Sequence, residues 1–278
     1  MKKTIIAFLA VLLAACEKPP VEDLMANVSD KSGNVVLKIE ADNNATRATA
    51  LSDVCGRLNV AVFDQSGKKV KTVAQVVSDV DFGVVGLSLS PGSYQVVVIG
   101  HSCTGSATIT SPEKVTFPSN KVTDTFYYCG ELTATTEKQE VGINLQRSVA
   151  MLRLKLTGVA NDVASLKFYY LGGSSTFSPD AGLGVVNSKQ TEVRAFSNDG
   201  VYEIYTFPHS TQDVLTKVTV TALDAGDNEV SECLIENVPV TVNRITLYEG
   251  DFVSGGGSPL SVNINVNAEW EGIDKISY

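Results

Sequence analysis

Few side chains in this sequence have the types and spacings that catalysis requires. The chain contains two histidines: His101 ends an apolar run, and His209 follows Phe207-Pro208 in a turn-like setting. A Ser–His–Asp triad uses a histidine as its general base, but no G-x-S-x-G elbow is present to supply the nucleophile. The sequence therefore predicts no enzymatic activity, no catalytic residues and no small-molecule substrate.

Carboxylates form two local groups that could bind Ca²⁺ or exchange protons. They are Asp79 with Asp81, and Asp224 with Asp227 and Glu229. An EF-hand loop places its oxygen ligands at fixed positions around a glycine, and neither group has that spacing. Acidic residues this close in sequence are typical of solvated turns, and no cysteine or histidine spacing is typical of zinc. We expect no metal and no cofactor.

Cys16 is the residue with the best-defined chemical role. The basic start Met1-Lys2-Lys3, the apolar run Ile5–Leu13 and the small residues before Cys16 predict a signal peptide over residues 1–15. The apolar run is too short to span a bilayer. Leu-Ala-Ala-Cys also matches the lipobox of bacterial lipoproteins, which predicts cleavage between Ala15 and Cys16 and acylation of the Cys16 thiol. Each buried acyl methylene contributes about 0.8 kcal/mol to membrane binding. A plain secretory signal with a chance cysteine is the alternative.

The four remaining cysteines, Cys55, Cys103, Cys129 and Cys233, leave the disulfide question open. An exported chain enters a compartment in which thiols are oxidised. A Cys55–Cys103 or a Cys103–Cys129 bridge would join residues of the first half. Buried free thiols are the alternative, because cysteine also packs as a small apolar residue.

Length and charge narrow the class of protein. With 278 residues, the chain suits one large domain or two ordinary ones. Its formal net charge is −9. Nucleic acid is therefore not an expected partner, because binding to phosphates requires a concentrated basic surface.

Apolar and polar residues alternate with a period of two along most of the chain, which is typical of half-buried strands. Turn signals such as Ser90-Pro91-Gly92-Ser93 separate the alternating runs. Short strands divided by turns predict an all-β fold of the sandwich type. The expected strands are Val35–Ala41, Leu58–Phe63, Val84–Leu89, Tyr94–Ile99, Lys114–Phe117, Val141–Leu145, Ala150–Leu156, Ser165–Leu171, Val201–Phe207, Val214–Leu223, Val238–Leu247 and Leu260–Trp270.

The pattern divides the mature chain into a tether and two β-sandwich domains. Residues 16–34 are acidic and contain two prolines, and we expect them to form the tether. The boundary between the domains is expected just before Arg147, which gives an N-terminal domain over 35–146 and a C-terminal domain over 147–278. Gly172–Gly184 and Asn187–Asp199 are expected to be loops.

The first expected strand is a candidate for exchange between subunits. Val35, Leu37 and Ile39 alternate along it, and burying each contributes roughly 1.5–3 kcal/mol. Arg47 and Ala48 follow in a polar segment where an Arg-specific protease could cut. Release of the strand would leave an apolar groove with unpaired backbone groups, which a strand of another molecule could fill. The alternative is that Arg47 is a solvated linker charge.

The last expected strand is a second candidate. Leu260, Val262, Ile264 and Val266 alternate with polar residues after a Gly/Ser-rich stretch. Such a strand could reach a neighbouring subunit, or it could complete its own sandwich.

Taken in order along the chain, these short motifs resemble those of the fimbrillin superfamily, the pilus proteins of the Bacteroidetes group. After the lipobox, the similar segments are Thr46-Arg47-Ala48, the Pro-Gly-x-Tyr hairpin at Pro91–Tyr94, Leu145–Leu154, and Val242–Gly250 followed by an alternating strand with Trp270. The resemblance covers nearly all of the mature chain.

The resemblance implies two tandem transthyretin-like β-sandwich domains and no enzymatic activity. It also implies export as a lipoprotein to the surface of the outer membrane, with other fimbrial subunits as partners. In stalk pilins of the superfamily, an Arg-specific protease removes the segment before the groove and a neighbour's strand fills it. Members of the FimB and Mfa anchor type keep their lipid and hold the base of the fimbrium, and Phe126–Cys129 is more similar to that branch.

Three alternatives remain. The Arg47 site also suits a processed stalk or tip subunit. A surface lipoprotein that binds glycans would need exposed aromatic residues, and aromatic residues make up only 7% of the chain, with a single tryptophan. A lipoprotein hydrolase is disfavoured by the two isolated histidines.

Overall fold

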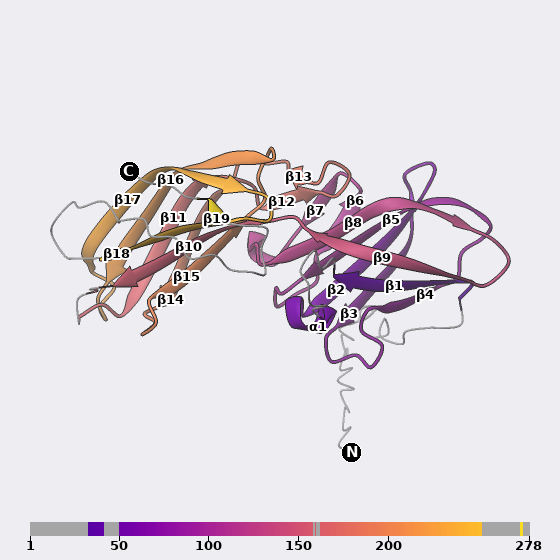
Figure 1. Ribbon diagram of the computed structural model, residues 1–278, viewed down its shortest axis with the longest axis horizontal. Helices are drawn as coiled ribbons and strands as arrows, with labels where there is room; N and C mark the ends of the chain where they lie inside the picture. The colour runs from indigo at the N-terminus through magenta and orange to yellow at the C-terminus, as the bar shows by residue number, and fades with distance from the viewer. Residues whose placement is uncertain (1–32, 42–49, 158, 160–161, 252–272, 275–278) are drawn as a thin grey trace, which may run out of the picture.

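The computed structural model describes residues 33–41, 50–157, 159, 162–251 and 273–274 (Figure 1). Strands make up most of these residues. The helices among them are the four-residue α1 (Leu51–Val54) and the three-residue 3-10 helix η2 (Pro118–Asn120). The expected all-β fold is confirmed.

The first half forms a folded seven-stranded sheet with the order β3-β2-β5-β8-β9-β1-β4. β8 and β9 pair only at Phe126 with Arg147 and at Tyr127 with Gln146. The sheet turns at this point, and side chains from both of its parts meet in one apolar cluster, the N-terminal core. The strands are β1 (Val35–Ala41), β2 (Arg57–Asp64), β3 (Lys69–Val76), β4 (Val84–Leu87), β5 (Gly92–His101), β8 (Thr125–Ala134) and β9 (Gln139–Arg147).

The second half has two sheets with the orders β15-β10-β18-β19 and β14-β11-β16-β17. Alternate residues of β11 and β16, among them Phe168 and Val220, enter a second cluster, the C-terminal core. The strands are β10 (Ala150–Thr157), β11 (Ser165–Gly172), β14 (Lys189–Ala195), β15 (Val201–Thr206), β16 (Gln212–Leu223), β17 (Glu229–Thr241), β18 (Ile245–Asp251) and β19 (Ile273–Asp274).

A small sheet joins the two halves, which lie end to end in Figure 1. Its order is β13-β12-β7-β6, with β6 (Thr108–Ser111) and β7 (Lys114–Thr116) from the first half and β12 (Thr176–Ser178) and β13 (Leu183–Gly184) from the second. A third apolar cluster, the junction core, contains Val97 and Phe117 from the first half and Phe177 and Phe207 from the second.

Two expected loops contain strands, so those predictions were wrong. Gly172–Gly184 contains β12 and β13, and Asn187–Asp199 contains β14. β14 is an edge strand whose residues are alternately exposed and half-buried, and it therefore has no apolar face for a sequence pattern to show. β12 and β13 are only three and two residues long, too short to produce a recognisable alternation.

The expected strand Val238–Leu247 was also wrong, because a turn divides it between β17 and β18. Asn243 adopts a left-handed conformation with φ of 57°, and the Arg244 amide donates to the Thr241 carbonyl at 3.1 Å. Asparagine tolerates this conformation better than most residues. The turn transfers the chain from one sheet to the other, and β17 and β18 consequently belong to opposite layers.

Candidate assembly strand and its surroundings

β1 lies inside the first sheet, between β9 and β4 (Figure 1). It pairs in parallel with β9 over seven positions, from Val35 with Gln139 to Ala41 with Leu145. It pairs antiparallel with β4 over four positions. Among the described residues β4 has no other strand partner, and β1 therefore connects β4 to the rest of the sheet.

The three expected exchange residues of β1 point into the N-terminal core. Val35 and Leu37 are fully buried and Ile39 is 4% exposed. They belong to the same apolar cluster as side chains of β2 and β5, including Leu58 and Val98. At roughly 1.5–3 kcal/mol for each side chain, their burial supplies a large share of the stability of a domain.

Gly33 and Asn34, at the end of the expected tether, hold the start of β1 in place. The Asn34 amide nitrogen donates to the carbonyl oxygens of Leu89 at 2.9 Å and Thr135 at 2.6 Å. Its amide oxygen accepts from the Leu89 backbone N–H at 2.8 Å. A side chain at Gly33 would collide with Leu87, because its Cβ would lie 2.1 Å from the Leu87 carbonyl oxygen. Sequence reasoning missed both residues, and a Gly-Asn pair directly before an alternating run was the available signal.

Buried Gln75 supports the other end of β1. Its amide nitrogen donates to the carbonyl oxygens of Asp81 at 3.2 Å and Val84 at 2.9 Å, and its amide oxygen accepts from the Gly83 N–H at 3.0 Å. The Gly83 carbonyl then accepts from the Ile39 N–H at 2.8 Å. One glutamine side chain thus orders the loop against which the end of β1 rests.

Arg147 connects the last residues of β9 to the second half. Its guanidinium forms two bonds with the Asp124 carboxylate, at 2.8 and 3.0 Å, and donates to the Asn243 amide oxygen at 3.1 Å. It also lies over the Phe126 ring, 4.6 Å from the centroid. With its side chain 10% exposed, Arg147 ties the turn before β18 to the first half.

Both ring nitrogens of His101 bond groups of the fold itself. His101 is fully buried, its Nε2 bonds Asn59 Oδ1 at 2.9 Å, and its Nδ1 accepts from the Cys103 N–H at 3.1 Å. This arrangement requires the neutral ring with the proton on Nε2. Burial, and secondarily the charge of Arg57, lower the pKa of His101 to about 4.

The other polar groups singled out in the sequence hold turns. His209 Nδ1 bonds the Asp213 carboxylate at 2.7 Å, and its Nε2 bonds the Val186 carbonyl at 3.1 Å. The Asp224 carboxylate accepts from the backbone N–H groups of Gly226 and Asn228. No group of His, Cys, Asp or Glu in the described part of the chain is arranged to hold a metal ion.

Cys55, Cys103, Cys129 and Cys233 are free thiols. The Cys55–Cys103 and Cys103–Cys129 bridges are therefore wrong, and the alternative of free thiols is confirmed. Cys103 donates to the Lys121 carbonyl, and burial raises the pKa of Cys55 to about 12.

Several expected site residues lie outside the described residues. They are Ala15, Cys16, Arg47, Ala48, Leu260, Val262, Ile264 and Val266. Within the described ranges, no helix is long and apolar enough to cross a membrane.

The sequence model of the fimbrillin-A associated anchor proteins Mfa1 and Mfa2 matches residues 27–274. The chain belongs to this family. The expected resemblance to fimbrial anchors is thereby confirmed, and the family is one of fimbrial anchor proteins, not an enzyme family. No curated protein matches the sequence.

Solved structures similar to this fimbrial chain share little sequence with it. The fimbrial anchor protein Mfa2 from Porphyromonas gingivalis is 11% identical, with 71% of this chain and 80% of that chain covered at a TM-score of 0.39. A fimbrial assembly protein from Parabacteroides distasonis is 16% identical, with coverages of 78% and 89% and a TM-score of 0.41. A candidate polysaccharide-binding protein from Bacteroides thetaiotaomicron is 14% identical, with coverages of 71% and 78% and a TM-score of 0.49.

Proposed function

We propose that this protein is the lipid-anchored base subunit of a surface fimbrium and that it binds other subunits by strand complementation. Family membership supports the fimbrial role. The observation that supports strand complementation is the groove that β1 fills between β4 and β9, because a neighbouring subunit without this strand would offer the same groove to a strand of this chain.

Membrane attachment rests on Cys16. Cleavage between Ala15 and Cys16 and acylation of the thiol would hold the protein in the outer membrane, with the expected tether, residues 16–34, as the connection to the first domain. Acyl chains bind a bilayer strongly enough to hold a protein without a membrane-spanning segment.

Retention of the lipid and cleavage at Arg47 exclude each other. Cys16 and β1 both precede Arg47, so one cut would remove the lipid and release the strand together. An anchored base subunit therefore keeps β1, and its own groove stays filled. The strand available for assembly is then Leu260, Val262, Ile264 and Val266, which enters the groove of the neighbouring subunit by main-chain pairing and apolar contact.

The division of the chain into sandwich domains at 35–146 and 147–278 forms part of this proposal. Separate N-terminal and C-terminal cores support it, and β9 ends at Arg147 while β10 begins at Ala150. A rigid pair of domains suits a base subunit, because force along the fimbrium passes through the junction core.

The N-terminus of the protein recovered from the cell envelope tests the anchored state. Mass spectrometry should find an acylated Cys16 joined to an intact Arg47, and a Cys16→Ser chain should leave the membrane fraction. A mature N-terminus at Ala48 would contradict the base assignment and identify a processed stalk or tip subunit.

Substitutions in the last alternating segment test the assembly mechanism. The double variant Val262→Asp and Ile264→Asp should abolish binding to other fimbrial subunits, because charges cannot enter an apolar groove. Asn263→Asp with Asn265→Asp is the matched control, since these positions face the other side of a strand. Far-UV circular dichroism should be unchanged in both. Loss of β signal in the first variant would mean that the segment completes its own sandwich.

A further inference from the structure

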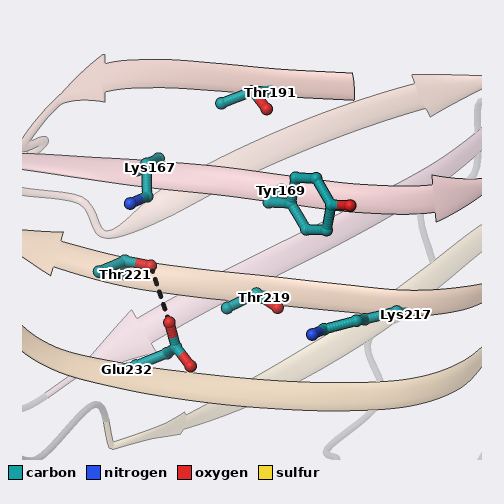
Figure 2. A pocket seen from close by; sticks show the side chains of 7 residues that line it. All are labelled: Lys167, Tyr169, Thr191, Lys217, Thr219, Thr221 and Glu232. Carbon is teal, nitrogen blue, oxygen red and sulfur yellow. Dashed lines mark hydrogen bonds between the residues drawn. The ribbon is translucent and has the colours of Figure 1, made fainter. Parts of the chain in front are cut away.

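A hollow of about 400 Å³ lies on the outer face of the β14-β11-β16-β17 sheet (Figure 2). Phe168, Val218 and Val220 point from the same strands into the C-terminal core, so the intervening residues face outward. Strand register places Tyr169 between Thr191 and Thr219. The residues lining the hollow are Lys167, Tyr169, Thr191, Lys217, Thr219, Thr221 and Glu232.

Two threonines form the floor of the hollow. Thr219 and Thr221 are 6% and 1% exposed although they lie on the outer face, among the longer side chains that line the hollow. Thr221 Oγ1 makes one long bond, 3.4 Å from Glu232 Oε2. Thr219 Oγ1 has no hydrogen-bond partner among the described residues. A buried hydroxyl without a partner is unfavourable, so a ligand atom that reaches it gains an interaction that the free protein lacks.

The sides of the hollow combine an aromatic ring with positive charge. Lys167 and Lys217 lie on either side of the Tyr169 and Thr219 pair, and Lys189 Nζ lies 5.8 Å from the centroid of the Tyr169 ring. Glu232 is the one acidic residue of the lining. Glu236 lies opposite Lys217 in the register of β16 and β17, so the lysines of this face, Lys167, Lys189 and Lys217, outnumber the nearby carboxylates Glu232 and Glu236 by one. This small excess contrasts with the net charge of −9 of the whole chain, and it favours an anionic ligand.

We infer that this hollow binds an acidic saccharide. The Tyr169 ring offers a flat apolar surface for one face of a sugar ring, and Glu232 and Thr221 offer partners for its hydroxyl groups. Lys217 and Thr219 are neighbours on one face of β16, and together they supply an ammonium and a hydroxyl donor for a sugar carboxylate. The inference is independent of the proposed assembly role, and it runs against the sequence expectation that no small molecule binds.

Saturation-transfer difference NMR should be used to measure the binding of two pairs of saccharides to the full chain. The pairs are 3′-sialyllactose with lactose, and tri-galacturonate with its methyl ester. At least one acidic member should bind about tenfold more tightly than its neutral partner, because a charge-assisted bond is lost in the latter. Failure of both acidic saccharides to bind, or equal binding within both pairs, would overturn the inference.

Substitutions in the hollow test whether the acidic saccharide binds there. Thr219→Val removes the unpartnered hydroxyl without changing side-chain shape, so it should leave the melting temperature equal or higher while weakening acidic saccharide binding about fivefold. Lys217→Gln should abolish the preference for the acidic partner. Lys71→Gln, which removes an exposed charge from β3, is the matched control and should bind as the parent does. Equal binding by the parent and both hollow variants would place the ligand elsewhere. Altered self-association of Tyr169→Ala in a chain that binds no saccharide would instead identify the face as a protein interface.

Discussion

Two polar side chains, the half-buried Asn34 and the buried His101, stabilise the first half through hydrogen bonds. Asn34 joins the start of β1 to Leu89 and Thr135 by hydrogen bonds. His101 joins the end of β5 to Asn59 and Cys103 in the same way. Neither residue forms part of a reactive pocket. Both satisfy backbone or amide groups that would otherwise be left unpaired in the fold.

Replacing Asn34 should loosen β1. Asn34→Ala removes three hydrogen bonds and leaves the Leu89 and Thr135 backbone groups without them, so the free energy of unfolding should fall by about 1–3 kcal/mol. Urea denaturation measures this change. Asn198→Ala, at an exposed position, should change stability by less than about 0.5 kcal/mol. Equal effects of the two substitutions would show that Asn34 does not hold the strand.

His101 should make the protein less stable in acid. Its folded pKa of about 4 lies below its ordinary value of 6.5, so the unfolded chain binds more protons between these pH values. The contribution of His101 to the free energy of unfolding is therefore complete above pH 6.5. It is lost as the pH falls towards 4, by about 3 kcal/mol in total. Unfolding midpoints between pH 7 and pH 4.5 should show this slope, and His101→Gln should flatten it. An identical slope in His101→Gln would refute the assignment.

At the scale of elements, β1 differs from its neighbours in how the chain connects to it. It pairs in parallel with β9, which follows it by about a hundred residues, and no hairpin links it to β4. A strand held only by pairing and side-chain burial can leave without disrupting the pairing of β9 with β8, although β4 would lose its one described strand partner. A hairpin strand such as β3 has no such freedom, because a short turn joins it to β2, the strand with which it pairs.

The sequence predicts some elements of this fold and not others, for physical reasons. β1, β10 and β11 were found because each buries one face, which produces a clean alternation. β14 was missed because it is an edge strand without a buried face. The burial of Val35, Leu37 and Ile39 followed from local pattern alone. The Thr219 hollow did not, because it depends on the register of four strands, one of which, β14, the sequence pattern did not reveal.

An Arg-specific protease should cut after Arg47 before it cuts elsewhere. Arg147, the comparison site, has a side chain that is only 10% exposed and is bonded to Asp124 and Asn243, so it should resist cleavage in the folded protein. Timed digestion with mass spectrometry of the fragments gives the order of cuts. Arg47→Gln should remove the first cut and leave the later ones. First cleavage at Arg147, or lasting resistance at Arg47, would count against an exposed processing site.

At the scale of the whole molecule, the junction core makes the two halves one mechanical unit. The Phe207 ring stacks on Phe117 from the first half at 5.4 Å and on Phe177 at 4.8 Å between centroids. β7 and β12 pair across the same junction. Arg147 adds a polar connection beside the apolar one. In the proposed base subunit, tension between membrane and fimbrium would pass through this junction, in which the rings of Phe177 and Phe207 are fully buried.

Removal of the Phe207 ring should separate the unfolding of the two halves. The parent should unfold in one transition, because the junction core couples its parts. Phe207→Ala should cost about 3–5 kcal/mol, since the ring is fully buried, and should divide calorimetric unfolding into two transitions. Phe196→Ala is the control, because that ring is 37% exposed and its loss should leave one transition. Two transitions in the parent would show that the junction core does not couple the two halves.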